Sequence, residues 1–343
     1  MVSERSLEVL RVIVQDYVAS QEPVGSKAIV ERHSFGVSAA TIRNDMAQLE
    51  EEELITAPHT SSGRVPTDKG YRVFVDQLTE LRPLSPAQRQ AIETFLGEAV
   101  DLDDVLSRTV RLLSQFTSQV ALAQYPSFGS ARVRHVEIVA LGPTRLMTVL
   151  ITDTGRVDQR LLDVPTTVDD EALAELRGRV NAELGGLPLA DVAAKLGTLP
   201  AAFPREHPDL VHAVVASLGE QIAANRQDRL VMAGAANLAR TERDFRGSIY
   251  PVLEALEEQV TMLKLFGEME IEVDEVRASI GHEHETSGGL GETSVVATGY
   301  TTTGGGLAHL GVLGPTRMDY SNNMAAVRAV ARYLTRLLGE DDR

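Results

Sequence analysis

The segment SAATIRNDMAQLE, residues 38–50, combines a helical period of apolar side chains with an opposite face that carries few long charged ones. The apolar positions that share one helical face are Ala39, Ile42, Met46 and Leu49. The opposite face shows Ala40, Thr41, Arg43, Asn44, Ala47 and Gln48. A helix that faces only solvent usually carries charged side chains there, so this pattern predicts a short helix whose first two turns approach another molecule.

Two further helices and a hairpin surround this segment in the sequence. Residues 3–20 and 26–33 each predict a helix, and turns that contain Pro or Gly separate the helices. After the third helix, LIT and RVPT predict two short strands joined by the turn APHTSSG. The hairpin carries His59, Ser61, Ser62 and Arg64. Three helices followed by this hairpin predict a winged helix-turn-helix over residues 1–82.

A winged helix reads DNA when the first turns of its third helix enter the major groove. Ala40 and Thr41 are short enough to permit close approach, and the Thr41 methyl group can meet a thymine. Arg43 can bond a guanine or a phosphate, and Asn44 can bond an adenine through two hydrogen bonds. The predicted DNA contacts are Ser26, Lys27, Ser38, Ala40, Thr41, Arg43, Asn44, Gln48, His59, Ser62 and Arg64.

The same pattern leaves a second interpretation open, because winged helices also serve as protein-interaction modules. The chain has a formal net charge of −16, and residues 1–82 hold 9 Lys and Arg against 13 Asp and Glu. This charge argues against non-specific binding to nucleic acid, because phosphates repel an acidic protein. A DNA-binding role therefore depends on where the positive charges lie.

Composition excludes several other classes of protein. The chain has no cysteine, which excludes disulfides, thiolate nucleophiles and thiolate metal sites. Its first residues lack the basic and apolar regions of a secretory leader, and no run of 18 apolar residues predicts a membrane span. We therefore expect a cytoplasmic protein without a membrane partner.

Three N-terminal motifs and one C-terminal motif carry a resemblance to a known family. PVGSKAIVE, VSAATIRNDMAQLEEEELI and PHTSSGRVPTDKGYRVFVD resemble the N-terminal signature of the heat-inducible transcription repressor HrcA family. GVLGPTRMDYSNNMAAV, residues 311–327, resembles the second signature of that family. One departure lies at residues 280–284, where IGHEH stands in place of a pattern like IGxEN, so no role is carried over to His284.

The resemblance implies a negative regulator of class I heat-shock genes, which encode chaperones. It implies a homodimer that binds double-stranded DNA at an inverted-repeat operator of the CIRCE type. It also implies that heat relieves repression and that the chaperonin GroEL assists the repressor. No enzymatic activity and no cofactor are expected.

The resemblance further implies an α+β, multidomain fold with an N-terminal winged helix-turn-helix, a GAF-like α+β domain and an inserted, mainly helical dimerising segment. The winged helix-turn-helix DNA-binding domain takes residues 1–82, and a linker with a connecting helix takes 83–104. The GAF-like domain takes 105–184 and 230–343, and the dimerising segment takes 185–229. The strands expected in the first part of the GAF-like sheet are VRHVEIVAL, RLMTVLIT and VDQRLLDV. One long helix is expected over 249–267.

Other candidate chemistry is sparse. His282 and His284 would share one face of a strand and could chelate a metal, although two imidazoles without a third ligand are a weak site. The Gly-rich segments GGLGETS and YTTTGGGLAHLG fit neither a P-loop nor a dinucleotide fingerprint. No G-x-S-x-G elbow is present, so no catalytic and no metal-binding residue is assigned. A ligand-binding role for the GAF-like domain stays an alternative.

Overall fold

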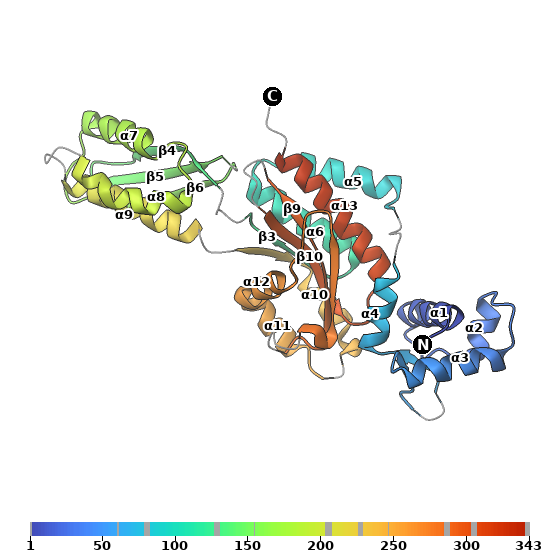
Figure 1. The fold of residues 1–343 in the computed structure, drawn as a ribbon. Coiled ribbons are helices and arrows are strands. Elements are labelled where there is room, and N and C mark those ends of the chain that lie inside the picture. The colour runs from blue at the N-terminus through green and yellow to red at the C-terminus, as the bar shows by residue number, and fades with distance from the viewer. Residues whose placement is uncertain are drawn as a thin grey trace.

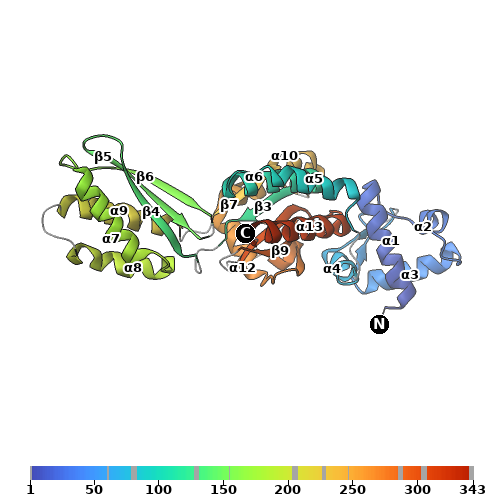
Figure 2. The same cartoon turned by 90° about the horizontal axis from the view of Figure 1, so that it is seen from above.

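The computed structural model describes residues 2–59, 62–78, 83–126, 131–153, 155–202, 208–225, 229–245, 247–284, 289–302 and 307–339. It combines helices with several antiparallel sheets, in agreement with the predicted α+β class. Figures 1 and 2 show three regions in a row, which we name the head (residues 2–78), the body (83–126 and 229–339) and the lobe (131–225).

The head contains its helices and strands in the predicted order. Three helices come first, α1 (Glu4–Ser20), α2 (Ser26–Arg32) and α3 (Ala39–Glu51). A two-stranded antiparallel sheet, β1 (Ile55–Thr56) and β2 (Val65–Pro66), and the helix α4 (Asp68–Asp76) follow. The core of the head is formed by apolar side chains of α1, α2 and α3, including Leu10, Ile13, Ile29, Ile42 and Leu49. The apolar period of each helix is thus satisfied by its neighbours.

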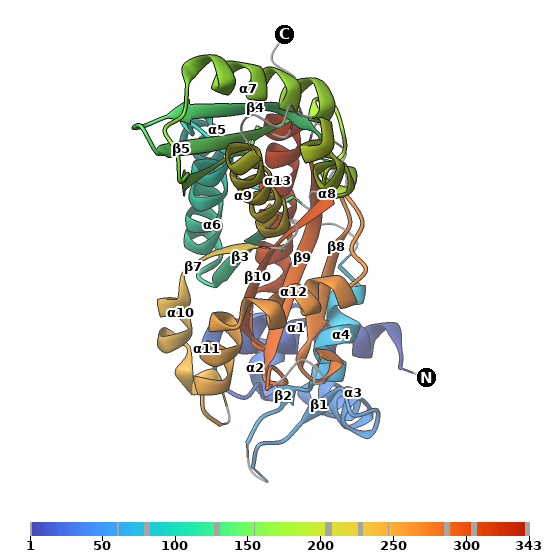
Figure 3. The ribbon, with the colours of Figure 1, turned by 90° about the vertical axis from the view of Figure 1, so that its left-hand side faces the viewer.

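A five-stranded antiparallel sheet forms the centre of the body. Its strands are β3 (Val120–Gln124), β7 (Leu230–Ala233), β8 (Val276–Ile280), β9 (Thr293–Thr301) and β10 (Leu307–Pro315). Their order in the sheet is β7-β3-β10-β9-β8, and Figure 3 shows them side by side from β7 to β8. Strands far apart in the sequence therefore build one layer.

Helices cover both faces of this sheet. One face packs against the core shared by α5 (Pro86–Gly97), α6 (Leu102–Thr117) and α13 (Tyr320–Gly339). The other face packs against α10 (Ala235–Arg240), α11 (Tyr250–Glu257) and α12 (Gln259–Glu268). The single long helix expected over 249–267 is wrong, because the backbone leaves the helical region at Glu258 (φ −81°, ψ 79°).

The lobe has a sheet and a core of its own. Its strands β4 (Val133–Ala140), β5 (Arg145–Thr152) and β6 (Val157–Asp163) pair in the order β4-β5-β6. The helices α7 (Asp170–Leu184), α8 (Leu189–Thr198) and α9 (Pro208–Asn225) cover one face of this sheet. The short 3-10 turn η1 (Leu199–Ala202) follows α8.

The structure corrects the expected place of these three strands. They were expected to extend the sheet that contains residues 230–343, yet no strand of the lobe pairs with a described strand of the body. The separate unit therefore begins before β4 instead of at residue 185, and it is an α+β unit instead of a mainly helical one. The sequence identified the strands correctly, but it does not specify their pairing partners, which are set by tertiary packing.

Candidate nucleic-acid interface

The N-terminal end of α3 is capped and exposed. The Oγ atom of Ser38 accepts a hydrogen bond from the backbone N–H of Thr41 at 3.2 Å, which satisfies one of the free donors of the first turn. Ile42, Met46 and Leu49 are buried, as their period predicts. On the other face, Thr41 is half-buried. The remaining predicted contact residues there are exposed: Ser38, Ala40, Arg43, Asn44 and Gln48.

Arg43 and Asn44 are the two predicted contacts on α3 whose polar side chains are available to a ligand. Both are exposed, and within the described residues neither makes a side-chain hydrogen bond or an ion pair. Two other predicted contacts already have intramolecular partners. The Oγ1 atom of Thr41 lies 3.0 Å from the Ser38 hydroxyl, and the Oε1 atom of Gln48 accepts from Ser6 at 3.2 Å.

A buried polar contact, which the sequence analysis missed, holds α3 against α1. Arg5 donates two hydrogen bonds to the Asp45 carboxylate, at 2.9 and 3.1 Å, and the hydroxyl of Ser6 donates to the same group at 3.2 Å. The bond to Asp45 raises the pKa of Arg5 above its ordinary value. The signal for this contact was Asp45 itself, a charge between the buried positions 42 and 49, because a buried carboxylate requires a partner.

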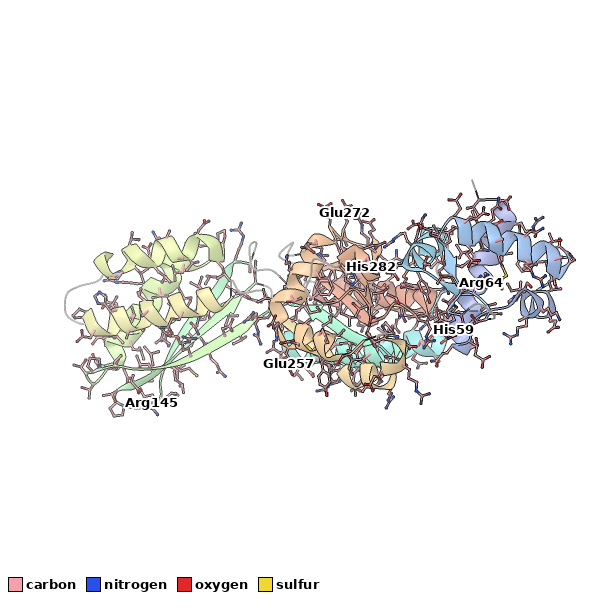
Figure 4. The ribbon with its side chains drawn as sticks, turned by 90° about the horizontal axis from the view of Figure 1, so that it is seen from below. His59, Arg64, Arg145, Glu257, Glu272 and His282 are labelled. Atoms are coloured by element: carbon pink, nitrogen blue, oxygen red, sulfur yellow. The ribbon has the colours of Figure 1, made fainter. Side chains whose placement is uncertain are left out.

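Two of the predicted contact residues of the hairpin, Ser62 and Arg64, make hydrogen bonds within the protein. The Ser62 hydroxyl donates to the His59 carbonyl at 2.7 Å and accepts from the His59 N–H at 3.0 Å, so it closes the turn. Arg64 donates to Glu50 at 3.0 Å and pairs through its backbone with Val24 in both directions at 2.9 Å. Ser61 lies outside the described residues. Figure 4 labels His59, which is exposed, and Arg64, whose side chain is tied to the far end of α3.

Two predicted contacts lie at the start of α2, which packs on α3. Ser26 is half-buried, and Lys27 is exposed without an ion pair among the residues that the structure describes. Few basic side chains of the described head are therefore both exposed and unpaired, and Lys27 and Arg43 are among them. The N-terminus of α3 adds partial positive charge beside them.

The two candidate metal ligands have separate structural roles. They lie in the 3-10 turn η3 (Gly281–His284), so the shared strand face expected for them is wrong. His284 is buried between Ser279, the Leu290 carbonyl and Thr293, at 2.8, 2.9 and 3.1 Å, and burial lowers its pKa. His282 lies outside on the surface, 2.6 Å from Asp68.

The described residues contain no group of three or more His, Cys, Asp or Glu placed to hold a metal ion. No helix in this part of the chain is both long and apolar enough to span a bilayer. The exposed first turns of α3 therefore stay the candidate site.

Comparison with known proteins gives the family of this chain. The sequence pattern of the HrcA protein C-terminal domain matches residues 103–324. The heat-inducible transcription repressor HrcA of Clavibacter michiganensis subsp. michiganensis is 67% identical over 340 residues, which cover 99% of this chain and 100% of that one. The chain belongs to the HrcA family.

A second relative agrees with this assignment. The heat-inducible transcription repressor HrcA of Leifsonia xyli subsp. xyli is 64% identical over 340 residues, with 99% and 100% of the two chains covered. Membership of the HrcA family makes the chain a heat-inducible repressor of transcription, and repression is generally not an enzymatic function.

One solved structure has the same fold as this HrcA-family chain. It is a crystal structure described as that of a hypothetical protein at 2.2 Å resolution, with a TM-score of 0.71 over 99% of both chains. Its sequence identity of 22% makes it evidence for the fold alone.

Proposed function

We propose that this repressor binds an inverted-repeat operator of the CIRCE type as a homodimer, through the head acting as a winged helix-turn-helix. The observation that carries the proposal is the exposed N-terminal half of α3, with Arg43 and Asn44 unpaired among the described residues. A symmetric dimer presents two such helices to the major groove, as an operator of inverted symmetry requires.

Each contact residue receives a role from its position. Arg43 and Asn44 read base edges, and Ala40 and Thr41 allow the backbone to approach the groove. Ser38 caps α3 and directs its N-terminus toward a phosphate. Ser26, Lys27 and Gln48 support the phosphate contacts and the orientation of α3.

The hairpin residues have a more limited role in this proposal. Arg64 must release Glu50 before its guanidinium can reach a phosphate or the minor groove, because the two groups are 2.9 Å apart. Ser62 shapes the turn, and His59 lies free at its edge. We therefore assign the largest share of base reading to α3.

We propose that the lobe forms the dimer and that the body is a GAF-like scaffold without a bound cofactor. The sheet face opposite α7–α9 is open and carries a group of apolar side chains beside the exposed pair of Arg145 and Asp163. Met147 pairs across the strands with Leu161, and Ile151 pairs with Val157. Val157 and Leu161 are 57% and 61% exposed, which is unusual for such side chains. A second copy of the chain covers this face in our proposal.

Regulation follows from the family resemblance. We propose that the genes controlled are class I heat-shock genes, that heat reduces the amount of active dimer, and that GroEL restores it in the cytoplasm. Operator binding after a heating and cooling cycle, with and without purified GroEL, tests this part. Equal recovery in both samples contradicts the assistance by GroEL and leaves DNA binding untouched.

A gel-shift titration tests the DNA-binding proposal. The repressor is titrated with an inverted-repeat duplex, with a duplex that holds one half-site, and with a random duplex, at several salt concentrations. We expect tight binding of one dimer to the inverted repeat and weak, strongly salt-dependent binding to the random duplex. Equal affinity for all three duplexes contradicts the proposal.

A further inference from the structure

The two signature motifs of the chain, some 240 residues apart, meet where the head touches the body, through the rings of Tyr71 and Tyr320. The helix α4 comes from the N-terminal motif and lies against η3 and the start of α13, and one hydrophobic core continues from the head into α6 and α13. Figure 4 shows His282 on the side of the body nearest the head. The proposed DNA contacts use none of the C-terminal motif, so its role needs a separate explanation.

Arg317 of the C-terminal motif joins three segments. It donates to both carboxylate oxygens of Asp244, at 2.8 and 2.6 Å, and to the backbone carbonyl of Val18 at 2.8 Å. The side chains of Arg317 and Asp244 are only 11% and 9% exposed. Val18 lies in the last turn of α1, where backbone carbonyls lack helical partners and cations are favourable. The body thus caps a helix of the head with a buried ion pair.

A second contact ties α4 to the turn η3. Asp68 lies 2.6 Å from Nδ1 of His282 and accepts its backbone N–H at 3.3 Å. Gly281 has a positive φ of 54°, and a Cβ atom there would lie 2.0 Å from the Asp68 carboxylate. Any other residue would be strained at this φ and would displace the Asp68 side chain.

Arg72 extends the same contact by one helical turn. Its Nε atom donates to Glu283 at 2.6 Å, its Nη2 atom makes a second bond to the same carboxylate, and it donates to the Ala278 carbonyl at 2.6 Å. A bidentate Arg–carboxylate pair fixes direction as well as distance. Beside it, the rings of Tyr71 and Tyr320 lie 5.6 Å apart.

We propose that these contacts form a rigid joint that fixes the head on the body, so that the repressor reads the spacing between operator half-sites. The joint consists of Asp68, Arg72, Asp244, Gly281, Glu283 and Arg317. A dimer with fixed heads offers its two α3 helices at one separation, whereas heads held only by the chain adapt to several separations. Arg317 is therefore a positioning residue for operator binding, and this inference rests on the proposed function.

Operators of altered spacing test the joint. The repressor is titrated with inverted repeats of natural spacing and of spacing lengthened by about five base pairs, which rotates one half-site by about half a helical turn. We expect the unchanged chain to lose about tenfold or more in affinity on the longer operator. Arg317→Ala keeps binding to a single half-site, but its preference between the two spacings falls to about threefold or less.

Two further variants serve as a second test of the joint and as its control. Arg72→Ala removes a half-buried part of the joint and gives the same loss of preference if Arg317→Ala does not fold. Arg332→Ala is the matched control, because Arg332 pairs with Asp274 at 3.0 Å on the body and both side chains are about 60% exposed. We expect it to behave as the unchanged chain. An unaltered spacing preference in both joint variants overturns the proposal.

A distance measurement separates failure of the joint from failure of DNA binding. The chain has no cysteine, so Glu8→Cys on the head and Glu257→Cys on the body place one pair of spin labels. Dilution with an excess of unlabelled chain removes distances between protomers. We expect one narrow distance distribution, which broadens with Arg72→Ala. An equal width in both samples overturns the joint even if operator binding is normal, whereas loss of operator binding with a narrow distribution overturns only the proposed function.

Discussion

Arg5 on α1 and Asp45 on α3 form a two-bond ion pair, at 2.9 and 3.1 Å, on the buried side of the helix that presents Arg43 and Asn44. The Asp45 carboxylate is almost fully buried. This polar contact between α1 and α3 therefore helps to fix the direction of α3.

Asp45→Ala is expected to lower the free energy of unfolding by about 1–3 kcal/mol, because Arg5 loses both of its hydrogen bonds to α3 and the buried Ser6 hydroxyl loses one of its two acceptors there. Denaturant unfolding measures the change. Arg332→Ala, which breaks an exposed pair with Asp274, serves as the control and is expected to change stability by about 0.5 kcal/mol or less. Equal effects of the two variants would contradict a supporting role for Asp45.

Arg43→Ala is expected to reduce discrimination between the operator and a duplex with one changed guanine by about 1–3 kcal/mol, because an exposed, unpaired arginine reads a base edge. Competition gel shifts measure it. Arg11→Ala removes an equal charge from the exposed surface of α1 and should leave discrimination unchanged. Equal loss of affinity for all duplexes would indicate that Arg43 contacts a phosphate instead of a base.

Lys27→Ala is expected to weaken binding to operator and random DNA alike, since Lys27 is an exposed cation at the start of α2. Loss of one phosphate contact also reduces the size of the slope of log affinity against log salt by about 1. A salt series of binding constants provides the measurement. An unchanged slope would contradict a phosphate contact by Lys27.

Leu161→Glu is expected to raise the dimer dissociation constant by about tenfold or more, because it places a charge on the open apolar face of the lobe. Sedimentation at several concentrations measures the dissociation constant. Ala174→Glu introduces the same charge at an exposed position of α7, on the helical side of the lobe, and should leave the dimer intact. Dissociation in both variants, or in neither, would contradict a dimer through this sheet face.

The pH dependence of stability should contain a contribution from His284. Burial lowers the pKa of His284 in the folded chain. Below the ordinary histidine pKa of about 6.5, His284 is therefore protonated to a greater extent in the unfolded chain than in the folded chain. Stability from this residue is present above that pH and is lost as the pH decreases. His284→Asn should flatten the acid side of the stability profile, whereas His59→Asn, at an exposed site, should not.

The parts of the fold that depend on local sequence were predictable. The third helix follows from the period of Ile42, Met46 and Leu49, and its start follows from the capping residue Ser38. The break at Glu258 was not predictable, because the helical pattern continues on both sides of it. The pairing of β4–β6 into a separate sheet was missed because alternation specifies a face of a strand and not its neighbour.

The candidate site was predictable in its residue types but not in its contacts. The sequence singled out Arg64 as a DNA contact, whereas the fold places Glu50 beside it. It treated His282 and His284 as one pair, whereas the turn η3 directs them to Asp68 and to Ser279. Each difference comes from a partner distant in the sequence, which no local spacing reveals.

The chain leaves the body after Tyr125 and returns at Arg229, and the N–H of Tyr125 donates to the Arg229 carbonyl at 2.8 Å. The antiparallel register of β3 and β7 runs up to this point, with Gln124 opposite Leu230. The lobe is therefore an insertion between β3 and β7, at the end of their antiparallel pairing. Evolution can enlarge, trim or exchange such an insertion without disturbing the alignment of the strands that carry it.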